Sequence, residues 1–181
     1  MNPFARLADK AIVEIFLLTR DETMFRLLYR RHADVLWRLA MRLAGGDRVV
    51  AADVTQDAWL RAIERLPQFR WQSSLRTWLC GFVVMRVKEH WRVEMNLHHR
   101  FESLDAAGDF MEPLVVSAEK IDLESALPLL PPGFRAIFTL HDLEGWKHEE
   151  IAKLLGITVG TSKSQLSRAR EALRKMLRED V

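Results

Sequence analysis

The sequence predicts an all-α protein made of two small helical domains joined by a flexible acidic linker. Apolar residues recur every three or four positions along most of the 181 residues, which is the period of an amphipathic helix. No Asn-Gly hairpin or alternating strand pattern competes with that period. Residues 98–121 lack it and are acidic, with Gly108 and Pro113 among them, which is typical of a linker. We therefore expect domains at residues 1–97 and 122–181, the second of which contains a helix-turn-helix.

The first two helices of the N-terminal domain have clear ends. Apolar spacing predicts one helix over about residues 24–44, and the Gly45-Gly46 pair ends it. Asp47 is well placed to cap a second helix over about residues 48–66. Pro67 stops that helix because proline lacks the backbone N–H that a helix interior needs.

A polar side of the second helix is a candidate surface for a protein partner. Asp53, Gln56 and Asp57 share that side. Packing is expected from Val54, Ala58, Leu60, Ala62 and Ile63. A mixed acidic surface of this kind suits a basic protein partner, and an ordinary solvated surface is the alternative.

A long helix is expected over about residues 75–95, with Ser73 or Ser74 as its cap. One stripe of this helix carries Thr77, Gly81, Met85, Lys88 and Arg92. The opposite arc is apolar and carries Cys80, Val83, Val84, Val87 and Trp91. The stripe is therefore a candidate track for nucleic acid, with the loop residues Arg70, Trp71 and Gln72 just before it. Aromatic rings can stack on unpaired bases, but Trp71 and Trp78 are equally well explained as core or rim residues.

Residues 146–176 are typical of a DNA-reading helix-turn-helix. A short helix carries Ile151 and Leu155 on its packing side, Gly156 marks the turn, and Thr158 can cap the next helix. That second helix buries Leu166, Ala169, Leu173, Met176 and Leu177, and it presents Lys163, Ser164, Ser167, Arg168, Arg170 and Arg174 to solvent. A basic helix after such a turn can enter a major groove. A solvated surface helix is the alternative, and the turn favours DNA reading.

The composition narrows the remaining classes. The net charge of +2 is a sum of opposed blocks, because residues 70–100 carry six Lys/Arg against two acids and residues 101–127 carry seven acids against one Lys. Cys80 is the only cysteine, so neither a disulfide nor a cysteine zinc site is expected, and a reducing cytoplasm fits. We expect no metal, no cofactor and no membrane insertion. Neighbouring acids such as Glu149 and Glu150 lack a supporting catalytic motif, so we do not expect an enzyme.

Three segments in this order resemble a bacterial RNA polymerase sigma factor of the extracytoplasmic-function class, group IV of the sigma-70 family. They are DVTQDAWLRA, LPQFRWQSSLRTWL and HEEIAKLLGITVGTSKSQLSRAREALR. The resemblance covers most of the chain. It implies that residues 1–97 form region 2, which binds core polymerase and opens the −10 element, and that residues 122–181 form region 4, which reads the −35 element as duplex.

The resemblance also implies three sets of site residues. Core polymerase is expected to contact Asp53, Gln56 and Asp57. The −10 element is expected to contact Arg70, Trp71, Gln72, Ser73, Met85, Lys88 and Arg92. The −35 element is expected to contact Thr161, Lys163, Ser164, Gln165, Ser167, Arg168 and Arg170. The implied partners are core RNA polymerase, promoter DNA and an anti-sigma factor, all met in the cytoplasm, and the polymerase supplies the catalysis.

The chain departs from the family pattern at a few positions. Met85 stands where the family usually has an Asn that helps to hold a flipped −10 base. Ser162 occupies a core-facing position that is commonly Val, and Gln165 replaces a common Arg. The alternative reading is a stand-alone helix-turn-helix regulator that binds duplex DNA without core polymerase. That reading leaves the Asp53 surface and the long-helix stripe unexplained.

Overall fold

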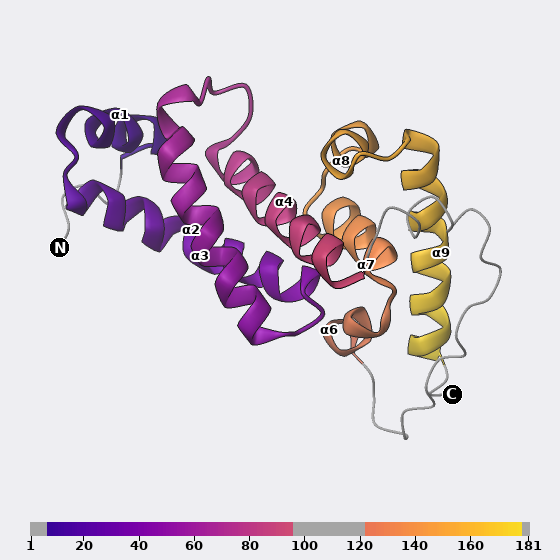
Figure 1. Ribbon diagram of the computed structural model, residues 1–181. Coiled ribbons are helices and arrows are strands. Elements are labelled where there is room, and N and C mark those ends of the chain that lie inside the picture. Colours follow the sequence, from indigo (N-terminus) through magenta and orange to yellow (C-terminus); the bar gives the residue numbers. More distant parts are fainter. Residues whose placement is uncertain (1–6, 96–121, 179–181) are drawn as a thin grey trace.

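The computed structural model describes residues 7–95 and 122–178, and all regular structure in these two ranges is helical (Figure 1). The N-terminal helices are α1 (Asp9–Thr19), α2 (Glu22–Leu43), α3 (Arg48–Arg65), the 3-10 turn η1 (Leu66–Gln68) and α4 (Leu75–Met95). The C-terminal helices are α6 (Leu123–Ala126), η3 (Leu127–Leu129), α7 (Pro132–Phe138), the π-turn η4 (Thr139–Leu143), α8 (His148–Leu155) and α9 (Val159–Arg178). The expected all-α fold is thereby confirmed, while the linker expected at residues 98–121 lies outside the described residues.

The turn between α2 and α3 follows from local chemistry. Both Gly45 and Gly46 have positive φ angles, of 67° and 86°, which an L side chain adopts only with strain. The Asp47 carboxylate then accepts hydrogen bonds from the backbone N–H groups of Val49 and Val50, at 2.8 and 3.0 Å. These interactions satisfy donors that the first turn of a helix leaves without partners. The predicted boundaries of both helices are confirmed to within two residues.

The start of α4 distinguishes between the two expected caps. The hydroxyl of Ser74 accepts a hydrogen bond from the backbone N–H of Thr77 at 3.0 Å, so Ser74 is the cap. The hydroxyl of Ser73 instead donates to the carbonyl of Ser74 at 3.3 Å. Pro67 lies in η1, directly after α3, as expected of a helix-stopping residue.

The apolar arc of α4 forms part of the core, as predicted. Cys80, Val83, Val84, Val87 and Trp91 are all buried. Burial, reinforced by the nearby Glu144 carboxylate, raises the pKa of the Cys80 thiol to about 12. A thiol that stays protonated at neutral pH is a poor nucleophile, so Cys80 acts as a small core residue.

The C-terminal helices include the expected helix-turn-helix. Gly156 ends α8 in the left-handed conformation with φ of 73°. The hydroxyl of Thr158 then accepts a hydrogen bond from the backbone N–H of Thr161 at 3.0 Å, which caps α9 as predicted. Ile151 and Leu155 of α8 are buried, so the first helix packs on the second.

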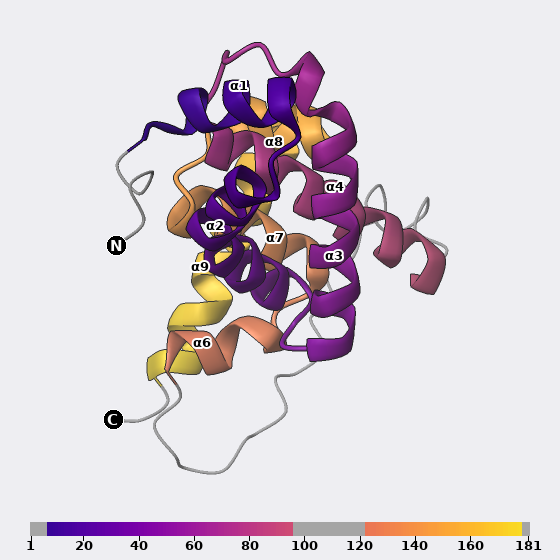
Figure 2. The same cartoon turned by 90° about the vertical axis from the view of Figure 1, so that its left-hand side faces the viewer.

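The two groups of helices lie against each other. α7 contacts α2, and α8 contacts α4. Buried apolar residues from both groups belong to one continuous core cluster. Figure 2 shows the N-terminal helices in front of α7, α8 and α9. Within the described ranges, none of the helices combines the length and the apolar character needed to cross a bilayer.

Candidate nucleic-acid interface

The outer side of α9 is polar and open, as the helical period predicts, whereas Leu177, which was expected on the packing side, is 40 % exposed near the end of the helix. Lys163, Ser164, Ser167 and Arg170 are exposed, while Thr161 and Arg168 are half-buried. The packing side carries Leu166, Ala169 and Leu173, each at most 3 % exposed. α9 contacts α6, α7 and α8 and lies at the edge of the molecule (Figure 1), so its exposed residues are accessible to a large partner. The helix therefore offers several donors and cations to a groove of duplex DNA.

The structure removes Gln165 from the expected set of DNA-contacting residues. Its side chain is only 2 % exposed, so it does not present its amide to DNA. The reason is its position on the helix, because residue 165 follows Ser162 by three positions and precedes Ala169 by four. Those two neighbours are completely buried, and Gln165 shares their side. Both polar atoms of the Gln165 amide lack a hydrogen-bond partner.

A chain of polar contacts ties η4 to α9. The guanidinium of Arg170 donates two hydrogen bonds to the Asp142 carboxylate, at 2.8 and 2.7 Å. These bonds hold the pKa of Asp142 below its ordinary value and raise the pKa of Arg170. Nδ1 of His141 lies 2.7 Å from the same carboxylate. Arg170 therefore anchors α9 as well as lying on its exposed side.

The same chain of contacts continues into α8. The ring of His141 stacks on that of His148, with 4.4 Å between centroids. Nδ1 of His148 lies 2.9 Å from the hydroxyl of Ser162, whose side chain is completely buried in α9. Burial also lowers the pKa of His148, which keeps its ring neutral near pH 7. The core-facing position predicted for Ser162 is thereby confirmed, and its hydroxyl has a partner.

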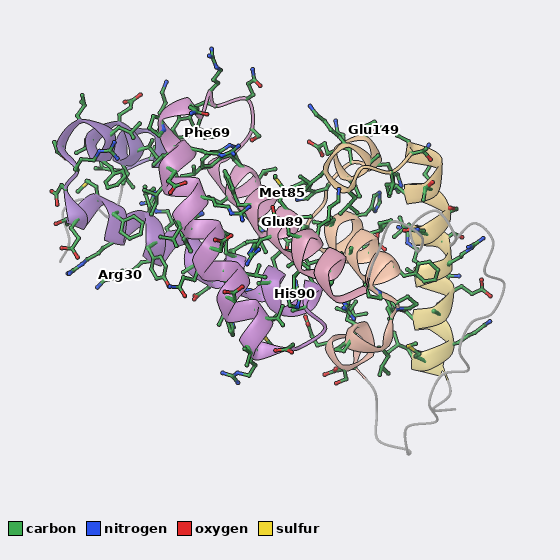
Figure 3. The ribbon with its side chains drawn as sticks, viewed as in Figure 1. Arg30, Phe69, Met85, Glu89, His90 and Glu149 are labelled. Atoms are coloured by element: carbon green, nitrogen blue, oxygen red, sulfur yellow. The ribbon has the colours of Figure 1, made fainter. Side chains whose placement is uncertain are left out.

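The stripe of α4 lies along α8. Met85 is 43 % exposed and lies on α4 near the border with α8 (Figure 3). One turn further along, Nζ of Lys88 donates to the carbonyl of Leu154 in the last turn of α8, at 3.4 Å. Thr77 and Gly81 are half-buried. The side chain of Arg92 lies outside the described residues.

The loop before α4 presents polar groups beside an aromatic row. Arg70, Gln72 and Ser73 are exposed. Trp71 is half-buried and has a positive φ of 56°, which is uncommon for a bulky residue and costs conformational energy. Its ring lies 4.8 Å from Phe69, and Phe69 stacks on Trp78 at 4.7 Å between centroids. The two tryptophans thus meet through Phe69 at the edge of the core.

The acidic surface of α3 is partly neutralised by arginines. The carboxylate of Asp57 lies 2.7 Å from Arg61 and 3.1 Å from Arg86 of α4. Glu89 accepts hydrogen bonds from the same two arginines, and these bonds lower the pKa of Glu89. Asp53 is 65 % exposed and contacts only the rim of this network, at 3.3 Å from Arg86. Gln56 is also exposed, so Asp53 and Gln56 are the accessible polar groups of the predicted surface.

Two apolar residues on the same side of α3 were not part of the predicted site. Leu60 was expected to pack, but it is 56 % exposed because its position places it beside Asp53 and Gln56. Val49 at the start of the helix is 80 % exposed. Single exposed apolar residues are common on protein surfaces, but Val49 and Leu60 lie on one side of α3 together with Asp53 and Gln56, so they add apolar area to the predicted polar surface. No sequence signal separated Leu60 from the buried apolar residues of α3.

The described residues offer no obvious set of ligands for a metal ion. Across residues 7–95 and 122–178, His, Cys, Asp and Glu side chains do not gather in groups of three or more suited to a metal ion.

Two family models match the chain in the order of the two helix groups. The model of sigma-70 region 2 matches residues 28–95, and the model of sigma-70 region 4 matches residues 120–173. Region 2 therefore spans α4 and its stripe, and region 4 spans the helix-turn-helix. A stand-alone helix-turn-helix regulator is not favoured, because such a protein has no need of region 2.

Curated relatives support the same family assignment over longer stretches of the chain. The chain is 33 % identical over 156 residues to the ECF RNA polymerase sigma factor SigE of Mycolicibacterium smegmatis, covering 83 % of this chain and 60 % of that protein. It is 31 % identical over 182 residues to the ECF RNA polymerase sigma-E factor of Escherichia coli, covering 93 % of each. The chain belongs to the extracytoplasmic-function family of sigma factors. As a sigma factor it directs promoter-specific initiation of transcription.

Solved structures share the fold. The sigma factor RpoE of Bartonella quintana, solved in complex with the anti-sigma factor NepR, is 27 % identical with a TM-score of 0.58, over 87 % of this chain and 98 % of that one. CnrH, solved in complex with the cytosolic domain of CnrY, has a TM-score of 0.61 over 96 % of this chain and 99 % of that one. At 23 % identity, CnrH supports the fold alone.

Proposed function

We propose that three surfaces of this sigma factor divide the work of initiation. The outer side of α9 reads the −35 element as duplex, through Thr161, Lys163, Ser164, Ser167, Arg168 and Arg170. The loop before α4 and the α4 stripe engage the opened −10 element, through Arg70, Trp71, Gln72, Ser73, Met85, Lys88 and Arg92. The domains that carry these surfaces are residues 1–97 and 122–181, with residues 98–121 as the acidic linker.

The observation that carries the −35 assignment is the division of α9 into two sides. Its packing side is buried, and its outer side groups three cations and three hydroxyl donors between residues 161 and 170. Cations meet phosphates, and hydroxyls and arginines can meet base edges, when such a helix lies in a major groove. The contact of Arg170 with Asp142 supports a role in holding α9 at a fixed angle to the groove.

Core RNA polymerase is the partner proposed for the α3 surface. Asp53, Gln56 and Asp57 supply polar groups, and the exposed Val49 and Leu60 supply apolar area beside them. An anti-sigma factor is a further proposed partner, by analogy with the solved complex of RpoE with the anti-sigma factor NepR. We place these encounters in the cytoplasm. The chain is proposed to supply recognition and strand opening, while the polymerase performs the chemistry.

Reconstitution tests the proposal. The purified chain is mixed with core polymerase and a promoter library, and the start sites of the transcripts are sequenced. Specific transcripts are expected, and their absence despite tight binding to core polymerase would contradict the promoter-reading role.

A pair of leucine variants tests the α3 surface. Leu60→Ser is expected to weaken binding to core polymerase, because hot-spot apolar contacts at interfaces are worth about 1–2 kcal/mol or more. Leu129→Ser is the matched control, since Leu129 is similarly exposed, at 44 % against 56 %, but lies in η3. Equal affinities for the two variants in a fluorescence titration with core polymerase would exclude Leu60 from the interface.

A further inference from the structure

A fully buried hydroxyl lies near the start of α9, beside two of the proposed −35 contacts. Ser162 is 0 % exposed, and its neighbours Thr161 and Lys163 belong to the outer side of the helix. A hydroxyl that is removed from water costs free energy unless it makes a hydrogen bond. Nδ1 of His148, the first residue of α8, lies 2.9 Å from the Ser162 hydroxyl. This polar pair therefore ties α8 to the start of α9, the two helices that lie side by side in Figure 1.

The face of the His148 ring is held as well. It stacks on the ring of His141, with 4.4 Å between centroids and 27° between planes. Nδ1 of His141 lies 2.7 Å from the Asp142 carboxylate, which also accepts two hydrogen bonds from Arg170 of α9. The contacts therefore form a closed circuit that leaves α9 at Ser162 and returns to it at Arg170.

This circuit attaches α9 at two points. Ser162 and Arg170 are eight positions apart in the sequence, which is about 12 Å along a helix axis. A helix attached at one point alone can pivot about it, whereas attachment at both points sets its direction. Side chains that recognise a ligand must be held within about 0.5 Å of their productive positions. Loss of the Ser162 attachment should therefore weaken −35 recognition, although Ser162 itself is too buried to touch DNA.

A positive charge on His148 conflicts with its surroundings. The ionisable groups around the stacked pair of His148 and His141 are Asp142 of η4, Lys163 and Arg170 of α9, and Glu149 of α8 itself. Burial is the main cause that lowers the pKa of His148, the basic neighbours lower it further, and Glu149 opposes them. Because α8 begins at His148, the positive end of the helix dipole also lies there.

The charges of the other packed elements act elsewhere. α4 contacts α8, but its Lys88 donates to the carbonyl of Leu154 in the last turn of α8, at the opposite end from His148. Arg42 of α2 and Arg76 of α4 pair with Glu144, which follows η4. The charge state of His148 is therefore governed by groups of η4, α8 and α9.

We propose that His148 is a positioning residue for −35 recognition: its neutral ring holds α9 through Ser162, and its protonated ring releases α9, so that recognition weakens in mild acid. The inference rests on the proposed −35 role of α9. A neutral imidazole can accept the proton of the Ser162 hydroxyl, whereas an imidazolium can only donate. The protonated ring leaves the stack for solvent, because burial and basic neighbours oppose its charge.

The pH range of the effect follows from the direction of the pKa shift. The pKa of His148 is lowered from its ordinary value of 6.5 while the ring is held, and a released ring regains that value, so protons favour release. The −35 affinity should be constant above about pH 7.5 and should fall as the pH decreases through about 6.5. A released ring is about nine-tenths protonated at about pH 5.5, so the loss of affinity there is at most about tenfold.

Promoter binding by the reconstituted holoenzyme tests the inference. The full-length chain is assembled with core polymerase and titrated with a fluorescent duplex that carries a −35 element selected from the promoter library, and with a scrambled duplex. The titrations are run at about pH 7.5, 6.5 and 5.5 with constant ionic strength. The ratio of the two affinities, here the −35 preference, removes the pH dependence of non-specific binding. In the wild type it should fall about three- to tenfold between about pH 7.5 and about pH 5.5.

Two substitutions and their combination distinguish the hydrogen bond from a direct contact with DNA. His148→Phe keeps an aromatic ring for the stack but leaves the Ser162 hydroxyl without its partner. It should lower the −35 preference near neutral pH about fivefold or more and make it independent of pH. Combining His148→Phe with Ser162→Val replaces the polar pair by an apolar pair, a change that can be nearly neutral. The double variant should therefore recover the wild-type preference near neutral pH and remain independent of pH.

His32→Gln is the matched control. His32 is buried in α2, its pKa is also lowered chiefly by burial, and its ring contacts Asp9 of α1 rather than α9. This variant should keep the wild-type pH dependence of the −35 preference. Circular dichroism at each pH checks that every variant keeps its helices.

The outcomes separate the positioning role from the −35 assignment. Equal affinities of the wild type for the −35 and scrambled duplexes near neutral pH would refute the assignment of α9, and the inference with it. A −35 preference that does not change with pH would overturn the inference alone. A His148→Phe variant that Ser162→Val fails to rescue would also overturn it, because His148 would then not act through Ser162. The same holds if His32→Gln removes the pH dependence, since acid would then act on the whole fold.

Discussion

Replacing Gln165 by methionine distinguishes a core residue from a DNA-reading one. The Gln165 amide is 2 % exposed, and neither its oxygen nor its nitrogen has a hydrogen-bond partner. Methionine has nearly the same volume and no polar atom that needs a partner, so the packing should survive the change. If the Gln165 side chain belongs to the core, Gln165→Met should make the protein more stable. If it reads a base, the same change should weaken promoter binding.

The size of the effect follows from the burial. An amide held away from water without a hydrogen bond costs about 1–3 kcal/mol in proteins, and Gln165→Met should recover much of that. For a domain of this size, each kcal/mol shifts the melting temperature by about 2–4 °C. A rise of roughly 3–8 °C is therefore expected. If Gln165 read a base edge instead, the loss would amount to about 1–3 kcal/mol of discrimination at one position of the −35 element.

Two measurements decide between these outcomes. Calorimetric or circular-dichroism melting gives the stability, and titration with selected −35 duplexes gives the affinity. Gln56→Met on α3 is the matched control, because Gln56 is exposed and its replacement should change the stability by less than about 0.5 kcal/mol. A destabilised Gln165→Met protein with lower −35 selectivity would refute the burial argument and restore Gln165 to the DNA-contacting set.

Three further expectations concern DNA contacts and pH. Lys163→Ala should lower the slope of log affinity against log salt by about 0.9 if Lys163 neutralises one phosphate, and an unchanged slope in titrations at several salt concentrations would show that it touches none. Met85→Asn restores the residue usual in the family and should change base preference within the −10 element more than −35 affinity; identical promoter-library preferences would rule this out. Burial, opposed by Asp9, lowers the pKa of His32 from 6.5, so the unfolded chain takes up a proton first as the pH falls. Stability should therefore decrease from about pH 7.5 to about pH 5.5, and His32→Gln should reduce this loss, as measured by urea midpoints at the two values.

Some charged residues both belong to a proposed binding surface and hold neighbouring helices together. Arg170 lies on the exposed side of α9 and also holds Asp142, so its removal affects both DNA contact and the placement of the helix. Arg86 of α4 similarly pairs with Asp57 on the proposed polymerase surface of α3, and it also pairs with Glu89 within α4. Alanine variants of these residues therefore combine two effects. Among the described residues Lys163 has no ion-pair partner, so a Lys163 variant reports on DNA contact more cleanly.

The sequence by itself determined the helices and the family. Asp47, Thr158 and Gly156 act on their nearest neighbours, so caps and turns are readable locally, and the apolar period separates the two sides of α9. Neighbouring positions on a helix differ by 100°, however, and the sequence alone did not place the border between buried and exposed sides. This is the reason that Gln165 and Leu60 were assigned to the wrong sides.

Only the tertiary structure decided how the two groups of helices meet. Arg76 pairs with Glu144 across 68 positions, and Arg135 reaches the end of α2 across 92. No local pattern encodes such partners, because a charged residue in a sequence looks the same whether it faces water or a distant opposite charge. Burial in the tertiary structure distinguishes the two cases. Glu144 and Arg135 are held out of solvent, where each charge needs its partner.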